Sequence, residues 1–264
     1  MHPGLLRDVL TVVAGVFTGV LSAAFGIGGA TVSTPAIRLL GASALVAVGT
    51  TLPSILPSAL TGTYRYAQAG LIRWGAVRWC VPTGIVAAVG GSLLSRVVPG
   101  HGHWLMILTA VLLAFTAARM ARDRPSPNTG TETADERSRE TPLVLSAVGT
   151  LAGLMSGLLG IGGGVVMVPG FTELAGMPLK AAIATSLACV GIFAIPSTIT
   201  HALLGDIDWR LALLLTVGVV PGARLGAAAA IKATDRTMRI AVALFLGVVS
   251  VIYGVGELLA LMRT

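Results

Sequence analysis

An apolar, glycine-rich segment occurs twice in this chain at a nearly constant offset. Residues 19–29 read GVLSAAFGIGG and residues 153–163 read GLMSGLLGIGG, and a proline follows each copy at the same distance, at Pro35 and Pro169. Many transporters are built from two related bundles whose broken helices meet near the membrane midplane. The duplication therefore predicts a chain made of two homologous halves, each with a glycine-broken helix.

Composition places both halves in a lipid bilayer. Of the 264 residues, 55% are hydrophobic and only 11% are charged, whereas a soluble domain has about a quarter of its residues charged. About 20 apolar residues cross a hydrocarbon core of about 30 Å. Runs near that length are expected to be membrane helices at Leu5–Phe25, Ala42–Gly62, Val77–Val98, Trp104–Ala121, Leu143–Gly160, Leu179–Leu203, Trp209–Ile231 and Met238–Leu261. The sequence thus predicts an all-α polytopic membrane protein.

Several other classes of protein are not indicated. The net charge of +7 comes from arginines at the ends of apolar runs, which is the usual bias of cytoplasmic loops, and no basic face with interleaved aromatics suggests nucleic-acid binding. There is no Walker loop, HExxH or GxSxG motif and no clustered metal ligands. We therefore expect no catalytic residues, no cofactor and no metal, and we expect Cys80 and Cys189 to be free, buried thiols.

A polar tract separates the halves. Residues 122–142 read RDRPSPNTGTETADERSRETP, a composition that cannot bury enough apolar surface to fold alone. We expect a first transmembrane repeat at residues 1–121, a hydrophilic linker at 122–142 and a second transmembrane repeat at 143–264. The apolar pieces Ala30–Leu40 and Gly164–Ala175, which follow the glycines, are too short to span unaided.

The orientation of the second repeat in the membrane, relative to the first, is indicated by the charges of the loops. Loop 65–78 is basic whereas its counterpart 205–208 is acidic, as expected if the two loops face opposite sides of the membrane. We therefore favour inverted repeats, with an odd number of crossings in each half, over parallel repeats with an even number. The first apolar run aligns with an internal segment, so we expect it to be a membrane helix and not a cleaved signal.

The glycine clusters are the leading candidates for a binding site. Glycine adds backbone freedom without side-chain packing, and broken backbone at membrane depth must be buried in protein or line a wet cavity. A short helix after each break would direct unpaired N–H groups, with partial positive charge, at an anion. We expect helix breaks at Gly26, Pro35, Gly160 and Pro169, and substrate contacts from Gly28, Gly29, Gly162, Gly163 and Gly164.

The alternative use of these glycines is close helix packing. The spacing of Gly15 with Gly19, and of Gly149 with Gly153, fits an interface where small residues let helix backbones approach. The proline that follows each copy favours the broken-helix interpretation. Further prolines at positions 53, 57 and 196 suggest that two other helices are kinked or interrupted.

Few polar side chains lie deep in the apolar runs. Duplicated hydroxyls at an offset of 135 are expected to bind substrate, because neutral donors hold an anion without a desolvated charge; these are Thr50, Thr51, Thr185 and Ser186. Arg224 lies inside an apolar run, where it would either pair with the anion or extend to the membrane surface. His201 is a candidate for proton coupling or a packed interfacial residue, and Arg65 and Tyr66 are expected in the interfacial belt.

The segments GVLSAAFGIGGATVSTPAI and GLMSGLLGIGGGVVMVPGF resemble the duplicated signature of the TauE/SafE family of sulfite exporters and organosulfonate permeases. The resemblance extends over the chain except the linker, and the first copy departs from the fuller GIGGG pattern at Ala30. It implies a secondary transporter that exports a small sulfur-containing anion, such as sulfite or a sulfoacetate-like sulfonate, across the bacterial inner (plasma) membrane, with protons as a possible coupling ion.

The residues that carry this resemblance are Gly28, Gly29 and Pro35, then Gly162, Gly163 and Pro169, then the duplicated hydroxyl pairs. Two alternatives stay open at this point. One is a transporter of another small anion, such as sulfate or thiosulfate. The other is a membrane-embedded redox or scaffold protein.

Overall fold

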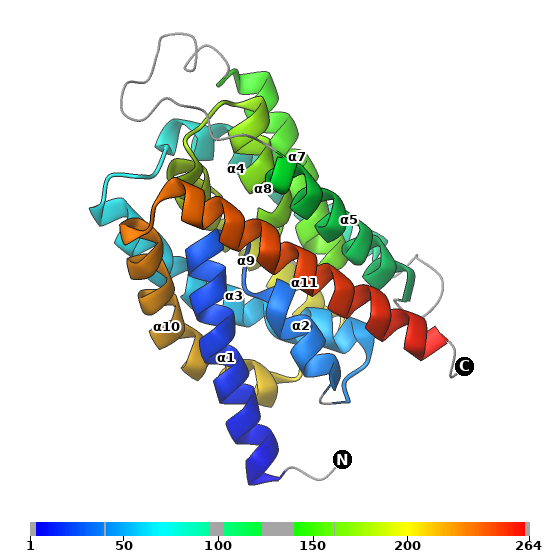
Figure 1. Cartoon of the computed structure of the whole chain (residues 1–264). Helices are drawn as coiled ribbons and strands as arrows, with labels where there is room; N and C mark the ends of the chain where they lie inside the picture. The colour runs from blue at the N-terminus through cyan, green and yellow to red at the C-terminus, as the bar shows by residue number, and fades with distance from the viewer. Residues whose placement is uncertain (1–3, 40, 96–102, 123–139, 161, 262–264) are drawn as a thin grey trace.

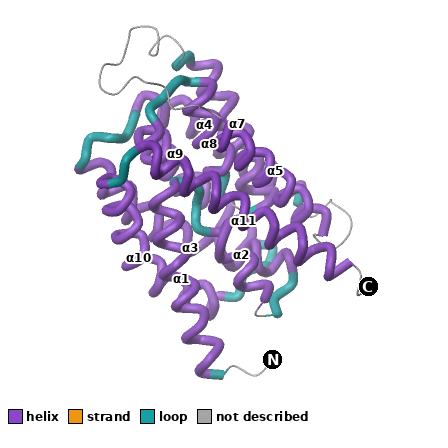
Figure 2. Tube along the Cα trace, viewed as in Figure 1, coloured by secondary structure: helices purple, strands orange, loops and turns teal. Residues whose placement is uncertain are grey.

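The computed structural model describes residues 4–39, 41–95, 103–122, 140–160 and 162–261. Within these ranges the chain forms helices joined by turns and contains no strand (Figure 2). The first half contains five helices: α1 (Leu5–Phe25), α2 (Ala30–Leu39), α3 (Ala44–Gln68), α4 (Trp74–Leu94) and α5 (His103–Arg122). The second half contains α7 (Pro142–Leu159), α8 (Gly164–Pro169), the π-helix η1 (Gly170–Leu174), α9 (Leu179–Leu203), α10 (Trp209–Lys232) and α11 (Asp235–Leu261). The all-α prediction is confirmed.

Within the described residues, six of the eight apolar runs expected to be membrane helices form helices of spanning length and composition. In the described part of the chain, six helices are long and apolar enough to cross a membrane: α1, α3, α4, α7, α9 and α10. The runs expected at 104–121 and 238–261 form α5 and α11, which pack against each other (Figure 1). Large apolar side chains such as Phe17, Val86 and Leu203 are exposed on the outer surface, as suits a molecule surrounded by lipid. Most of the predicted linker, residues 123–139, lies outside the described residues.

The two halves interlock through glycine-lined helix pairs. α1 of the first half packs along α10 of the second, and α7 packs along α4. A Cβ added to Gly19 would stand 2.8 Å from the amide nitrogen of Ala223, and one added to Gly153 would stand 2.7 Å from the Cα of Gly84. Real side chains essentially never approach so closely, so these glycines let the backbones touch, as in other membrane helix pairs.

The equivalent helices α3 and α9 lie antiparallel at the centre of the bundle. Thr50, near the start of α3, accepts a hydrogen bond from the amide of Asp208, 2.9 Å away, just after the end of α9. Thr185, near the start of α9, accepts one from the amide of Arg73, 3.0 Å away, just after the end of α3. Each helix therefore begins where the other ends, and equivalent contacts tie the halves together at both ends.

Prolines interrupt the helices less than the sequence suggests. α3 continues through Pro53 and Pro57, α9 through Pro196 and the short α2 through Pro35, so the expected break at Pro35 and the interruptions of the long helices are not observed. A proline removes one helix hydrogen bond, and tight packing inside a bundle tolerates that loss. Among the prolines that the structure describes, only Pro169 ends a regular segment, where α8 changes into the π-helix η1.

Candidate functional site

The two long helices at the start of each repeat stop at equivalent glycines. α1 ends at Gly26 and α7 at Gly160, each with φ of 66°, and each amide donates to a serine carbonyl one turn back, at Ser22 and Ser156. The backbone of a residue with a side chain rarely adopts this left-handed conformation, whereas glycine adopts it freely and commonly ends helices in this way. We refer to residues 26–29 as the first break and to residues 160–163 as the second break; Ile161 lies outside the described residues.

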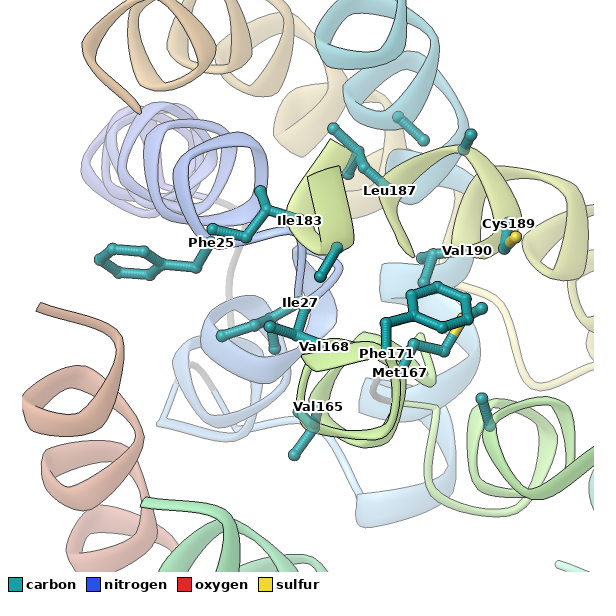
Figure 3. Packing of buried hydrophobic residues seen from close by; sticks show 14 of the residues in the cluster. Phe25, Ile27, Val165, Met167, Val168, Phe171, Ile183, Leu187, Cys189 and Val190 are labelled. Atoms are coloured by element: carbon teal, nitrogen blue, oxygen red, sulfur yellow. The ribbon is translucent and has the colours of Figure 1, made fainter. Parts of the chain in front are cut away.

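The two breaks contact each other in the middle of the molecule. A Cβ on Gly162 would stand 3.3 Å from the Cα of Gly28, 3.2 Å from Val190 and 3.5 Å from Ile55. Val190 and Ile55 lie near the midpoints of α9 and α3, so this contact marks the point where those two helices cross. Figure 3 shows buried apolar side chains of both repeats packed together, among them Ile27 of the first break, Val168 of α8 and Val190 of α9.

A short helix begins directly after each break. The amides of Val32 and Ser33 donate to the carbonyl of Gly29, and those of Val166 and Met167 to the carbonyl of Gly163, all at 3.1 Å. The first amides of a helix have no carbonyl partner within it, and they carry the positive end of its dipole. The glycines of both breaks are buried, so two such helix ends lie in the interior.

Hydroxyl groups gather around the first break. Thr34 of α2 shares a hydrogen bond of 3.3 Å with Thr51 of α3, and Ser58 donates to Ser22 at 3.1 Å. The methyl of Thr18 lies against Gly29, and its hydroxyl has no hydrogen-bond partner among the described residues. All five side chains are fully or almost fully buried. The first break is therefore surrounded by polar groups that carry no charge.

The second break is apolar at the equivalent positions. Val165, Met167 and Val168 of α8 take the places that Thr31, Ser33 and Thr34 hold on α2, and all are buried. Ala152 replaces Thr18 and Phe193 replaces Ser58. Ser156 keeps the place of Ser22, and its buried hydroxyl has no partner within the described part of the chain. The backbone of the site is thus nearly symmetric, while its side chains are not.

The duplicated hydroxyl pairs divide into two uses. Ser186 donates to the carbonyl of Gly26 at 2.8 Å and therefore lies at the first break, whereas Thr51 faces Thr34 on the short helix that follows this break. Thr50 and Thr185 instead hold the residues that precede α10 and α4. The sequence predicted the same role, substrate binding, for all four residues. The tertiary contacts distinguish Thr51 and Ser186 from Thr50 and Thr185, which bond to the residues before two helices.

The ionisable candidates lie away from the breaks. Arg224 is exposed on α10 and shares an outward-facing groove with Arg65. His201 is fully buried near the end of α9, with its Nδ1 3.3 Å from a carboxylate oxygen of Asp206. Tyr66, expected at the membrane surface, is buried instead, and its hydroxyl donates to the carbonyl of Ala23 at 2.7 Å. Cys80 and Cys189 are both free and buried.

Comparison with known proteins agrees with this architecture. A family model described as "Sulfite exporter TauE/SafE" matches residues 11–253. The chain belongs to the TauE/SafE family. No solved structure matches it significantly.

Related proteins of the TauE/SafE family carry general names. A probable membrane transporter protein of Xylella fastidiosa (strain 9a5c) is 28% identical over 220 residues, covering 83% of each chain. The probable membrane transporter protein YunE of Bacillus subtilis is 27% identical over 256 residues, covering 87% of this chain and 91% of the relative. With six apolar helices of spanning length in the described residues, the chain is a multi-pass bacterial membrane protein of a transporter family.

Sequence reasoning did not single out Thr18, Ser22 or Thr34. Thr34 and Thr18 differ between the two copies: residues 31–34 read TVST against VVMV at 165–168, and Thr18 aligns with Ala152. That difference is the signal that could have found them. Ser22 is shared with Ser156, so it could have been found only as a conserved position of the repeat.

Proposed function

We propose that this protein is a secondary transporter that exports a small sulfur-containing anion, such as sulfite or a sulfonate, across the inner membrane. The observation that carries the proposal is the contact between two helix breaks inside the bundle, each followed by the positively polarised end of a short helix. Helix N-termini of this kind are suited to oxyanions. Transport in place of catalysis agrees with the family of the chain.

The hydroxyls at the first break support an anionic substrate over a cationic one. The Thr18 hydroxyl has no hydrogen-bond partner among the described residues, whereas Thr34, Thr51 and Ser58 bond to protein atoms and would have to exchange these bonds to donate to an anion. No acidic side chain is among the described residues that surround the break. A cation would require carboxylates or several converging carbonyls. Neutral donors bind an anion without the cost of burying a permanent opposite charge, which helps the anion to leave again.

Alternating access is the proposed mechanism. The antiparallel packing of the equivalent helices α3 and α9 supports repeats of opposite orientation in the membrane. The close glycine contacts of α1 with α10 and of α4 with α7 each join one helix from each repeat. The moving bodies would therefore be these two helix pairs and not the two repeats, and rocking of one pair against the other would expose the breaks to each side in turn.

Either the membrane potential or a proton could drive export, and we propose His201 with Asp206 as the proton-linked pair. Histidine changes charge near neutral pH, and this pair lies beside Gly49 at the start of α3, where a Cβ on that glycine would stand 3.0 Å from Asp206. A change of charge there would act on the same helix that carries Thr50 and Thr51.

Flux measurements in proteoliposomes test the proposed substrate. Vesicles with purified protein should release labelled sulfite or sulfoacetate faster than empty vesicles, and parallel samples with sulfate and thiosulfate would reveal a wider anion range. Equal release with and without protein for both sulfur anions would end the substrate assignment. Faster release of sulfate or thiosulfate alone would replace it with another oxyanion.

A further inference from the structure

A groove on the outer surface contains two arginines that come from different repeats. It has a volume of about 580 Å³ and is lined by Leu60, Thr61, Tyr64, Arg65 and Gln68 of α3 and by Arg224 of α10. Both arginines are exposed. Within the described part of the chain neither guanidinium is paired with a carboxylate, and no lining residue is acidic. The groove therefore carries two positive charges that no described protein group balances.

The groove lies near one end of the bundle. α3 and α10 run in the same direction, because a hydrogen bond between Thr50 and Asp208 joins them near their starts and Arg65 and Arg224 line one groove farther along both helices. Arg65 lies about one turn before the end of α3, and Arg224 lies eight residues before Lys232, the end of α10, or roughly 12 Å at about 1.5 Å per residue. An arginine at that depth can extend its guanidinium to the level of lipid headgroups.

The same end of the molecule is basic. Basic residues lie at this end, where α3 and α10 stop and the helices that follow them begin. They include Arg73, Arg78, Lys232, Arg236 and Arg239. An excess of arginine and lysine marks the cytoplasmic side of a membrane protein, where anionic lipids are also attracted. The groove thus faces the leaflet surface at which negatively charged headgroups meet positive charge.

Two of the residues that line the groove, Leu60 and Tyr64, present apolar surface to the outside. Leu60 is 70% exposed and Tyr64 66% exposed, and Val217 and Leu225 of α10 are also exposed nearby in sequence. Such side chains face acyl chains, and tyrosine favours the level of the headgroups. A dissolved anion such as sulfite would gain nothing from contact with these apolar side chains. A phospholipid would place its phosphate on the arginines and its acyl chains along these side chains.

We propose that Arg65 and Arg224 bind the phosphate of an anionic phospholipid, which bridges α3 of the first repeat and α10 of the second. Guanidinium groups suit phosphate because their planar donors bind its oxygens in pairs. Basic pockets between membrane helices on the cytoplasmic side bind lipid headgroups in this way. The site is separate from the helix breaks and does not depend on the transported species.

Native mass spectrometry of delipidated protein in a neutral detergent tests the site, with dioleoylphosphatidylglycerol and dioleoylphosphatidylcholine as probes. Wild-type protein should bind phosphatidylglycerol in preference to phosphatidylcholine. Arg65→Gln and Arg224→Gln should each weaken phosphatidylglycerol binding about fivefold, and the double variant about 25-fold. Arg236→Gln, an equal loss of charge at an exposed position at the same end, should change it about twofold or less.

Additional variants and competing ligands distinguish lipid binding from poor folding and from binding of dissolved anions. Arg65→Lys with Arg224→Lys keeps both charges and should retain most of the preference, even if the glutamine variants fold poorly. Equal binding of the two lipids by wild-type protein, or full phosphatidylglycerol binding by a monodisperse double glutamine variant, would overturn the proposal. Displacement of phosphatidylglycerol by millimolar glycerol 3-phosphate or sulfite would also overturn it, because the groove would then serve dissolved anions.

Discussion

The Cα of Gly28 and the backbone of Gly162 lie against each other where the two repeats meet, so close that a Cβ on Gly162 would stand 3.3 Å from Gly28. These residues occupy equivalent positions in the two copies of the glycine motif. Both have positive φ, 84° and 87°. The contact joins the breaks into one structure, so a change in one copy is expected to affect the other.

Gly162→Ala should slow anion flux strongly while leaving membrane insertion intact. The new Cβ would meet Val190, Gly28 and Ile55 at 3.2–3.5 Å and would occupy an unfavourable backbone conformation, a strain on the order of 1–3 kcal/mol. Proteoliposome flux and yield from membranes are the two measurements. Gly90→Ala is the matched control, because nothing lies within 4 Å of the Cβ added there. Unchanged flux for Gly162→Ala would argue against a site at the breaks.

Thr50→Val and Thr185→Val should reduce stability more than they reduce substrate affinity. Each removes the acceptor for a partly buried amide of the opposite repeat, at Asp208 or at Arg73. An unsatisfied buried donor costs about 1–3 kcal/mol, and partial burial places the expected loss near the lower end of that range. Thermal unfolding in detergent would reveal the loss as a lower Tm, with Thr150→Val, an exposed hydroxyl bonded within its own helix, as the control. A raised KM without a change of Tm would instead place these threonines in the substrate site.

Thr34→Val should raise the KM for the exported anion by about twofold to tenfold, which corresponds to the net worth of one hydrogen bond. The variant keeps the shape of the side chain but removes the hydroxyl that faces Thr51. The reference is Thr172→Val, whose hydroxyl bonds only to carbonyls of its own segment. If both variants change KM equally, the hydroxyls at the first break have no special part in binding.

His201→Gln should abolish stimulation of flux by a pH gradient while leaving flux driven by the membrane potential. The glutamine side chain keeps polar atoms near Asp206 but cannot become positively charged, so the pair could no longer respond to protons. Flux would be recorded with each gradient imposed alone. Full stimulation of the variant by a pH gradient would assign proton coupling to a group other than His201.

The sequence alone determined the class, the duplication and the positions of the breaks. Apolar runs of spanning length predicted the long helices because the lipid interior requires every backbone group to be bonded within its own helix. Gly26 and Gly160 predicted the ends of α1 and α7 because only glycine adopts their conformation without strain. Such properties are local, and a local pattern of residues is sufficient to encode them.

Tertiary structure decided which residues meet. It brought Gly28 to Gly162, separated Thr51 and Ser186 from Thr50 and Thr185, buried Tyr66 and turned Arg224 outward. It also carried α3 and α9 through prolines expected to interrupt them. The direction that a helical side chain faces depends on which neighbours the helix packs against, and some of those neighbours lie more than a hundred residues away in the chain, as Gly26 does from Ser186.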